Sequence, residues 1–180
     1  QLASVTMPAS LEKIGAHAFD GCTSLTSITI PKTVYSTFEK DVMVSDRGNI
    51  TTVTKDVDGI GAYAFANCKN LENVIFEAGG TQRLSIGDYA FDNCINLKGT
   101  FDENTKKYVF TIPYRVRAEV VMNWEQENAQ RNYKFEQSIG IYAFANCTSL
   151  TNVVFEETGA GTFQTPVMIQ IGAFYQCTSL

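Results

Sequence analysis

The feature that most constrains this chain is a nine-residue phrase that occurs twice with a single change. Residues 60–68 read IGAYAFANC, and residues 139–147 read IGIYAFANC. Alignment on the pattern Ala-Phe-x-x-Cys adds three further copies, at 14–22, 86–94 and 169–177. Such self-similarity is the signature of a repeat architecture, in which each unit buries its apolar face against the next.

Each copy combines two periodicities. Ile14, Ala18 and Phe19 are spaced as one face of a short helix or helical turn. A leucine follows three residues after every cysteine. Apolar and polar residues then alternate as in a β-strand, for example in LTSITIP at 25–31. The strand-like text LASVTMP at 2–8 precedes the first copy in the same way. We therefore predict repeats of a helical turn and a strand, stacked so that the strands form a parallel sheet.

The combined pattern I-G-x-x-A-F-x-x-C-x-x-L-x-x-[IV]-x-[IF]-P resembles the BspA-like leucine-rich repeat family, also called the Treponema pallidum type. This family occurs in surface proteins of gut and oral bacteria and of some parasitic protists. The resemblance implies a cell-surface, adhesin-like role in binding host or bacterial proteins. For the fold we predict an α/β leucine-rich-repeat solenoid, a right-handed coil with a parallel β-sheet on one face and short helices or helical turns on the other.

The spacing of the copies predicts how the domain is organised. We expect one leucine-rich-repeat domain over residues 1–180, and a fragment of a longer array, because the text opens and stops in mid-repeat. The intervals between copies exceed the 23 residues that separate Leu2 from Leu25. We assign the excess to β-hairpin insertions, which lie at about 32–58, 99–109 and 114–137.

Composition excludes some partners. The net charge is −5, and no dense cluster of Lys or Arg occurs, so a nucleic acid partner is not expected. No apolar run approaches the length of about 20 residues that a bilayer helix needs. We therefore expect no membrane insertion by this segment, and a monomeric domain with a protein partner.

The chemically reactive residues do not form a catalytic or metal site in the sequence. The five cysteines share one repeat position and no C-x-x-C occurs, so we interpret them as small buried hydrophobes. His17, the only histidine, takes the position of a tyrosine in three other copies and is expected in a surface column. Residues 56–59 read DVDG, but Asn67 stands where a calcium loop has its last carboxylate. No catalytic residue, metal or cofactor is predicted.

The recurring glycine of the phrase indicates a backbone that needs a positive φ or a close approach. The last copy has Gln170 in this position, which makes its local turn geometry uncertain.

Two surfaces are candidates for binding. The outward strand positions would line one face as a weakly charged strip, and extended faces of this kind commonly bind partners in solenoids. The projecting segments carry aromatic residues, which either anchor a partner or pack on their own hairpins. The candidate partner-binding residues are Ser27, Thr29, Asn73, Ile75, Thr111, Asn152, Val154, Trp124 and Tyr114.

The resulting hypothesis is a non-enzymatic protein-protein interaction module of an adhesin-like protein, extracellular or at the cell surface. Its expected partners are host extracellular-matrix or bacterial surface proteins. One alternative is a carbohydrate-binding or carbohydrate-active solenoid, in which Glu77, Glu156 and Glu157 at strand ends would pair across layers. The other is a structural spacer in a larger surface protein.

Overall fold

The computed structural model consists of β-strands and turns. It describes the chain in five ranges. For the described residues within 38–56 and 119–136 it gives the backbone only. The described ranges are residues 2–44, 50–125, 130–136, 138–157 and 166–180.

The described ranges contain nine strands and no helix. It follows that they include no helix that could span a membrane. The strands are β1 (Ser27–Ile30), β2 (Thr37–Val44), β3 (Ile50–Val57), β4 (Asn73–Phe76), β5 (Thr100–Asp102), β6 (Lys107–Ile112), β7 (Glu119–Glu125), β8 (Gln130–Glu136) and β9 (Val153–Phe155).

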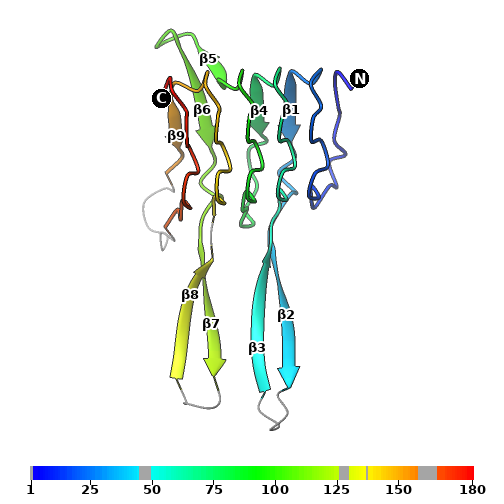
Figure 1. Cartoon of the computed structure of the whole chain (residues 1–180), viewed down its shortest axis with the longest axis vertical. Coiled ribbons are helices and arrows are strands. Elements are labelled where there is room, and N and C mark those ends of the chain that lie inside the picture. Colours follow the sequence, from blue (N-terminus) through cyan, green and yellow to red (C-terminus); the bar gives the residue numbers. More distant parts are fainter. Residues whose placement is uncertain (1, 45–49, 126–129, 137, 158–165) are drawn as a thin grey trace.

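The five copies of the phrase lie side by side in sequence order, which we call the repeat stack (Figure 1). The first isoleucine of each copy forms a parallel β-bridge with the first isoleucine of the next. On the other side of the stack β1, β4, β6 and β9 follow one another in the same order (Figure 1). The bridged residues are Ile14, Ile60, Ile86, Ile139 and Ile169.

Turns replace the short helices that the spacing allowed. The amide of Phe65 donates to the carbonyl of Ala90 in the next copy at 2.7 Å, whereas the amide of Ala64 donates to Gly61 within its own copy. An α-helix needs consecutive amides to bond four residues back along the same chain. Because alternate amides bond to the neighbouring copy instead, the helix does not form.

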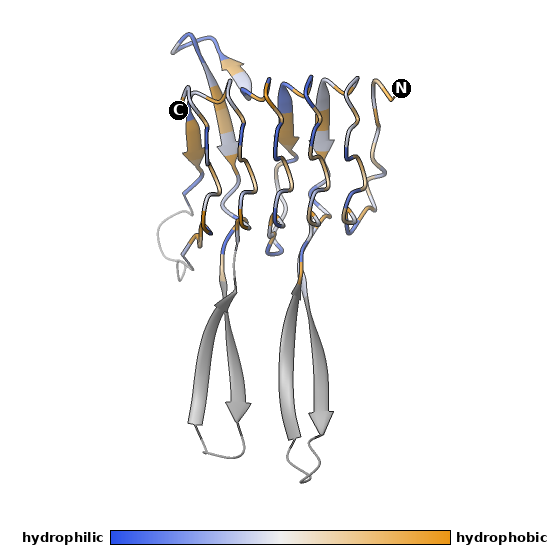
Figure 2. Ribbon diagram, in the orientation of Figure 1, coloured by the Kyte–Doolittle hydropathy of each residue, from blue (hydrophilic) through white to orange (hydrophobic). Residues whose placement is uncertain are grey.

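The core is a row of stacked phenylalanine rings, as the repeat pattern predicts. Each ring centroid lies 5.1 Å from the next along the row Phe19, Phe65, Phe91, Phe144. The last step, from Phe144 to Phe174, is 5.4 Å. Figure 2 shows apolar segments recurring in each repeat of the stack. The repeats therefore share one continuous interior.

The recurring glycine permits close packing of neighbouring repeats. A Cβ on Gly61 would come within 2.6 Å of the amide nitrogen of Ala16 in the preceding copy. Its φ is not positive, so the close approach, and not a left-handed backbone, is the reason for glycine here.

The sheet on the strand side is interrupted, in contrast to the single parallel sheet that was predicted. β1 pairs only with β4, while β6 pairs with β9 in parallel and with β5 antiparallel. The text at 2–8 forms no strand. The interruption has a local cause. In the third copy the chain forms β5, turns back, and forms β6, and it is β6 that pairs in parallel with β9.

Returning strand β6 fills the core positions of the third copy. Phe110 and Ile112 are buried, and they pair in register with Val153 and Phe155 of β9. The inserted hairpin thus replaces the repeat's own strand without opening the interior.

Two further hairpins project from the stack (Figure 1). β2 pairs antiparallel with β3, and β7 pairs antiparallel with β8, within the ranges assigned to the first and third insertions. The hairpins meet where Thr51 of β3 pairs with Glu125 of β7, so the four strands form one sheet in the order β2-β3-β7-β8.

Candidate partner-binding surface and cleft

The outward strand positions form an exposed surface on the strand side of the stack. Strict alternation in β1 buries Ile28 and Ile30 and exposes Ser27 and Thr29. Thr111 of β6 is exposed in the same way. We call this surface the strand face.

The strand face carries exposed aliphatic residues. Ile75 of β4 is 44% exposed and Val154 of β9 is 47% exposed. These are large values for side chains that gain free energy from burial. The strand face is therefore weakly charged and partly apolar.

Two of the predicted residues, Asn152 and Tyr114, are engaged in the fold itself. Asn152 donates from Nδ2 to the carbonyl of Tyr108 at 2.8 Å, which ties β9 to the inserted hairpin. Asn73 is half-buried, and its Oδ1 has no hydrogen-bond partner. The Tyr114 hydroxyl donates to the carbonyl of Gly80 at 2.8 Å, so this ring packs locally. For Trp124 the described structure gives the backbone in β7 and no side chain.

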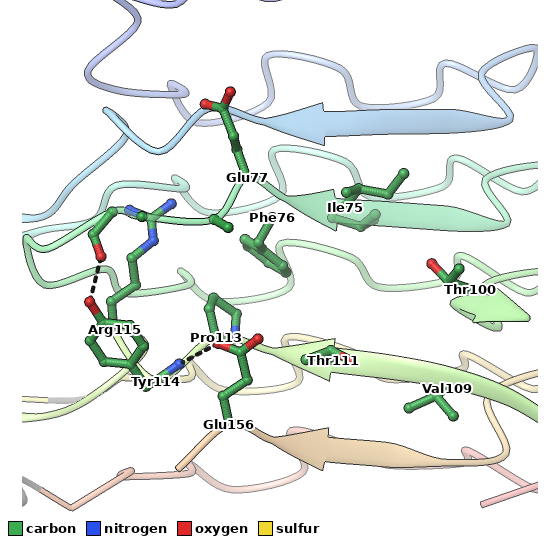
Figure 3. Close-up of a pocket in the computed structure, with 14 residues that line it drawn as sticks. Ile75, Phe76, Glu77, Thr100, Val109, Thr111, Pro113, Tyr114, Arg115 and Glu156 are labelled. Carbon is green, nitrogen blue, oxygen red and sulfur yellow. Dashed lines mark hydrogen bonds between the residues drawn. The ribbon is translucent and has the colours of Figure 1, made fainter. Parts of the chain in front are cut away.

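A cleft of about 370 Å³ opens on the strand face between β4 and β6, at the interruption of the sheet (Figure 3). We call it the β4–β6 cleft. Its mouth is formed by outward residues of the two strands, and Thr100 of β5 stands at one end (Figure 3). Lining residues include Ile75, Phe76, Thr100, Val109, Thr111 and Pro113.

Backbone groups of both strands face the cleft without a ladder partner. The amides of Asn73 and Glu77 donate to carbonyls on the β1 side, at 3.3 and 2.9 Å. Because successive residues of a strand direct their amides and carbonyls to opposite edges, those of Val74 and Phe76 face β6. No strand pair joins β4 to β6 within the described residues.

The glutamates at the strand ends do not face each other. Glu77 Oε2 accepts from the amide of Lys32 at 3.0 Å, and Glu156 Oε2 accepts from the amide of Tyr114 at 3.4 Å. Figure 3 shows Glu156 directed toward Pro113, and Glu77 directed away from it. Each carboxylate bonds to the amide that follows a proline in the neighbouring repeat, so both have an evident structural role.

A buried arginine lies behind the cleft, and sequence reasoning missed it. Arg115 is 1% exposed, and its guanidinium donates from Nη2 to the carbonyl of Pro31 at 3.3 Å and from Nη1 to that of Val34. Its Nε has no hydrogen-bond partner. Burial lowers the pKa of Arg115, because desolvation disfavours the charged form. The only signal in the sequence was its position in an insertion with alternating polarity.

An exposed aromatic pair on the β5–β6 hairpin was also missed as a candidate site. Phe101 and Tyr108 of the β5–β6 hairpin are 40% and 37% exposed, with ring centroids 5.2 Å apart. Lys98 places its Nζ 4.7 Å from the centre of the Tyr108 ring. The strand-like residues on both sides of the polar DENTKK turn, which include Phe101 and Tyr108, could have identified this exposed pair.

The opposite side of the stack carries a ladder of rings, as predicted for the position of His17. Ring centroids are 4.8 Å apart from His17 to Tyr63 and from Tyr63 to Tyr89, and 5.4 Å apart from Tyr89 to Tyr142. The rings cover one another's faces, which makes this column part of the packing between repeats.

The cysteines also form a column, which is buried at Cys68, Cys94 and Cys147 and partly buried at Cys22 and Cys177. Cys68 donates from Sγ to the carbonyl of Phe19 in the preceding copy at 3.0 Å, and the same contact recurs at Cys94 and Cys147. Burial raises the pKa of Cys68 to about 12. This thiol is therefore protonated at neutral pH. Among the described residues no group of three or more His, Cys, Asp or Glu could hold a metal ion.

Comparison with known proteins supports the interpretation of this sequence as a series of leucine-rich repeats. The family model described as BspA type leucine-rich repeat region matches residues 1–111 and 131–180, in six copies. Comparison with the curated proteins and with the solved structures gives no match. Proteins with such repeats are generally non-enzymatic interaction modules, typically of surface or secreted proteins. The chain belongs to the BspA-type leucine-rich repeat family.

Proposed function

We propose that this chain is a non-enzymatic protein-binding module of an adhesin-like protein, and that the strand face is its binding surface. The partners are host extracellular-matrix proteins or bacterial surface proteins. The observation that carries the proposal is the exposure of Ile75 and Val154 on the strand face, around the β4–β6 cleft.

This surface has the composition of a protein interface. Interface centres combine aromatic and aliphatic residues with few charges, and clefts in them take the anchoring side chains of the partner. A carbohydrate-active site would instead need two carboxylates arranged across the scissile bond. Glu77 and Glu156 each accept a backbone hydrogen bond and are directed differently, which favours the protein-binding proposal.

The wider setting of the module is part of the proposal. We place it in a right-handed solenoid that forms one domain over residues 1–180, with the hairpins as insertions, and outside the cell as a monomer. The family membership and the continuous phenylalanine row support the solenoid and its repetition.

Binding to an array of purified matrix proteins and bacterial surface proteins tests this function. We expect saturable binding to at least one of them, and at least about tenfold weaker binding by Ile75→Asp, which places a charge in the apolar centre. Lys69→Glu is the matched control, because Lys69 is exposed in the turns away from the strand face.

Two results would contradict the proposal. One is an array without any saturable partner for the folded wild-type chain. The other is a partner whose affinity falls equally with Ile75→Asp and Lys69→Glu, since binding would then not depend on the strand face.

A further inference from the structure

The β4–β6 cleft lies between two open strand edges. On the β4 side, the amides and carbonyls of Val74 and Phe76 face it, by the alternation described above. On the β6 side, the amide of Phe110 donates to the carbonyl of Asn152, just before β9, at 2.9 Å, so the backbone groups of Thr111 face the cleft. Strand edges of this kind are templates for pairing with another extended chain.

The chain itself occupies one end of the same interval. The amides of Lys98 and Gly99 both donate to the carbonyl of Glu72 at 3.0 Å, on the β4 side. The next residue, Thr100, pairs with Val109 of β6. At this end of the cleft, the extended segment 98–100 is therefore already bonded to the β4 side and to β6. Figure 3 shows Thr100 where that segment meets the cleft.

We propose that the β4–β6 cleft receives a short, extended, basic segment of the protein partner, which pairs main chain to main chain with the edge of β4. This inference rests on the proposed function and names the kind of partner that the strand face takes. A main chain supplies both donors and acceptors, which is what the open edges lack. A side chain carrying only donors or only acceptors would satisfy half of them.

The dimensions of the cleft suit a short segment. The four residues of β4 span about 13 Å at about 3.3 Å per residue, so about four residues of a partner can pair along this edge. The volume of about 370 Å³ is within the range of sites that hold ligands.

Charge complementarity determines the sign of the segment. Glu156 and Glu77 are the acidic residues lining the cleft, both at the end where β4 and β9 finish. The third charged residue, Arg115, is buried behind it with its Nη groups on backbone carbonyls. The open surface of the cleft is thus acidic, and a Lys or Arg in the segment would lie near Glu156.

A displayed library of random eight-residue peptides tests the proposal without knowledge of the natural partner. We expect selection on the folded chain to enrich peptides that combine strand-forming residues with Lys or Arg. A synthetic copy of an enriched peptide should bind at least about tenfold more weakly when alternate amides are N-methylated, because this removes main-chain donors and preserves the side chains.

Three variants place the peptide in the cleft. Thr111→Trp should abolish binding by filling the mouth, whereas Thr178→Trp, the same change at an exposed threonine in a turn of the last copy, should not. Glu156→Gln should weaken binding by basic peptides several-fold and leave the fold intact, since the glutamine oxygen can still accept from Tyr114.

The proposal is overturned if no peptide is enriched, if N-methylation has no effect, or if Thr178→Trp and Thr111→Trp act alike. These results are distinguishable from a failure of the proposed function. A protein partner that Ile75→Asp weakens but Thr111→Trp does not would keep the strand face as the binding surface and exclude strand addition in the cleft.

Discussion

At the scale of single residues, the repeat requires a left-handed backbone at two positions in each of the five copies. The first is the ladder position, where Tyr63 has φ 57° and Tyr89 has φ 56°. The second lies four residues later, where Asn67 and Asn93 both have φ 59°. Such a φ costs a residue other than Gly roughly 1 kcal/mol or more. Stacking of the rings and hydrogen bonds between the asparagines offset this cost.

We predict that Asn93→Ala lowers the free energy of unfolding by about 2 kcal/mol, as measured by urea denaturation. The change removes the hydrogen bond from Asn93 Nδ2 to Asn67 Oδ1 (2.9 Å) and leaves a Cβ without a side-chain amide in the left-handed region. Asn93→Gly loses the hydrogen bond but tolerates the φ, as Gly21 does in the equivalent position. A glycine variant that loses as much stability as the alanine variant would contradict this account.

At the scale of elements, one side chain connects the segments that follow three different strands. Arg115 follows β6, packs against Gly80 after β4, and donates to the carbonyls of Pro31 and Val34 after β1. Buried carbonyls without donors are costly. The arginine therefore satisfies a region where the insertions interrupt the regular ladder.

We predict that Arg115→Met lowers the free energy of unfolding by about 2–4 kcal/mol, although methionine fills part of the volume, because the carbonyls lose their charged donor. Arg117→Met is the matched control, since Arg117 is only half-buried two residues away. Thermal or urea unfolding of the two variants decides the point, and an equal effect of both changes would speak against the role of Arg115.

At the scale of the whole molecule, stability is distributed along the repeat stack. Each repeat contacts mainly its neighbours, so the middle repeats are supported on two sides and the outer ones on one. Phe65, Phe91 and Phe144 are fully buried, whereas Phe19 and Phe174 in the outer copies are partly buried. Local opening should therefore begin at the ends of the stack.

Native-state hydrogen exchange measures this gradient. We expect the amides of Phe65 and Phe91, which donate to the next copy at 2.7 Å, to exchange at least about tenfold more slowly than that of Cys177 in the last copy. Cys22 at the other end of the stack serves as a second reference, since its amide bonds only within its own copy. Uniform protection along the stack would show that the repeats open together.

Sequence reasoning was most reliable where a property repeats. The phenylalanine row, the ring ladder beginning at His17 and the outward positions of Ser27 and Thr29 follow from the spacing of equivalent letters. Stacked identical units impose the same environment on each equivalent residue, so five copies of one pattern determine which side chains face inward.

The tertiary structure decided what depends on contacts between dissimilar segments. Where short helices or helical turns were expected, it formed turns and no helix within the described residues, because alternate amides bond to the neighbouring copy. It interrupted the parallel sheet and opened the β4–β6 cleft, because an insertion in the third copy displaces a strand. It also paired Thr51 with Glu125 and buried Arg115. The interrupted sheet, the cleft, the pairing of Thr51 with Glu125 and the buried arginine each arise once, between residues far apart in sequence, so no periodicity encodes them.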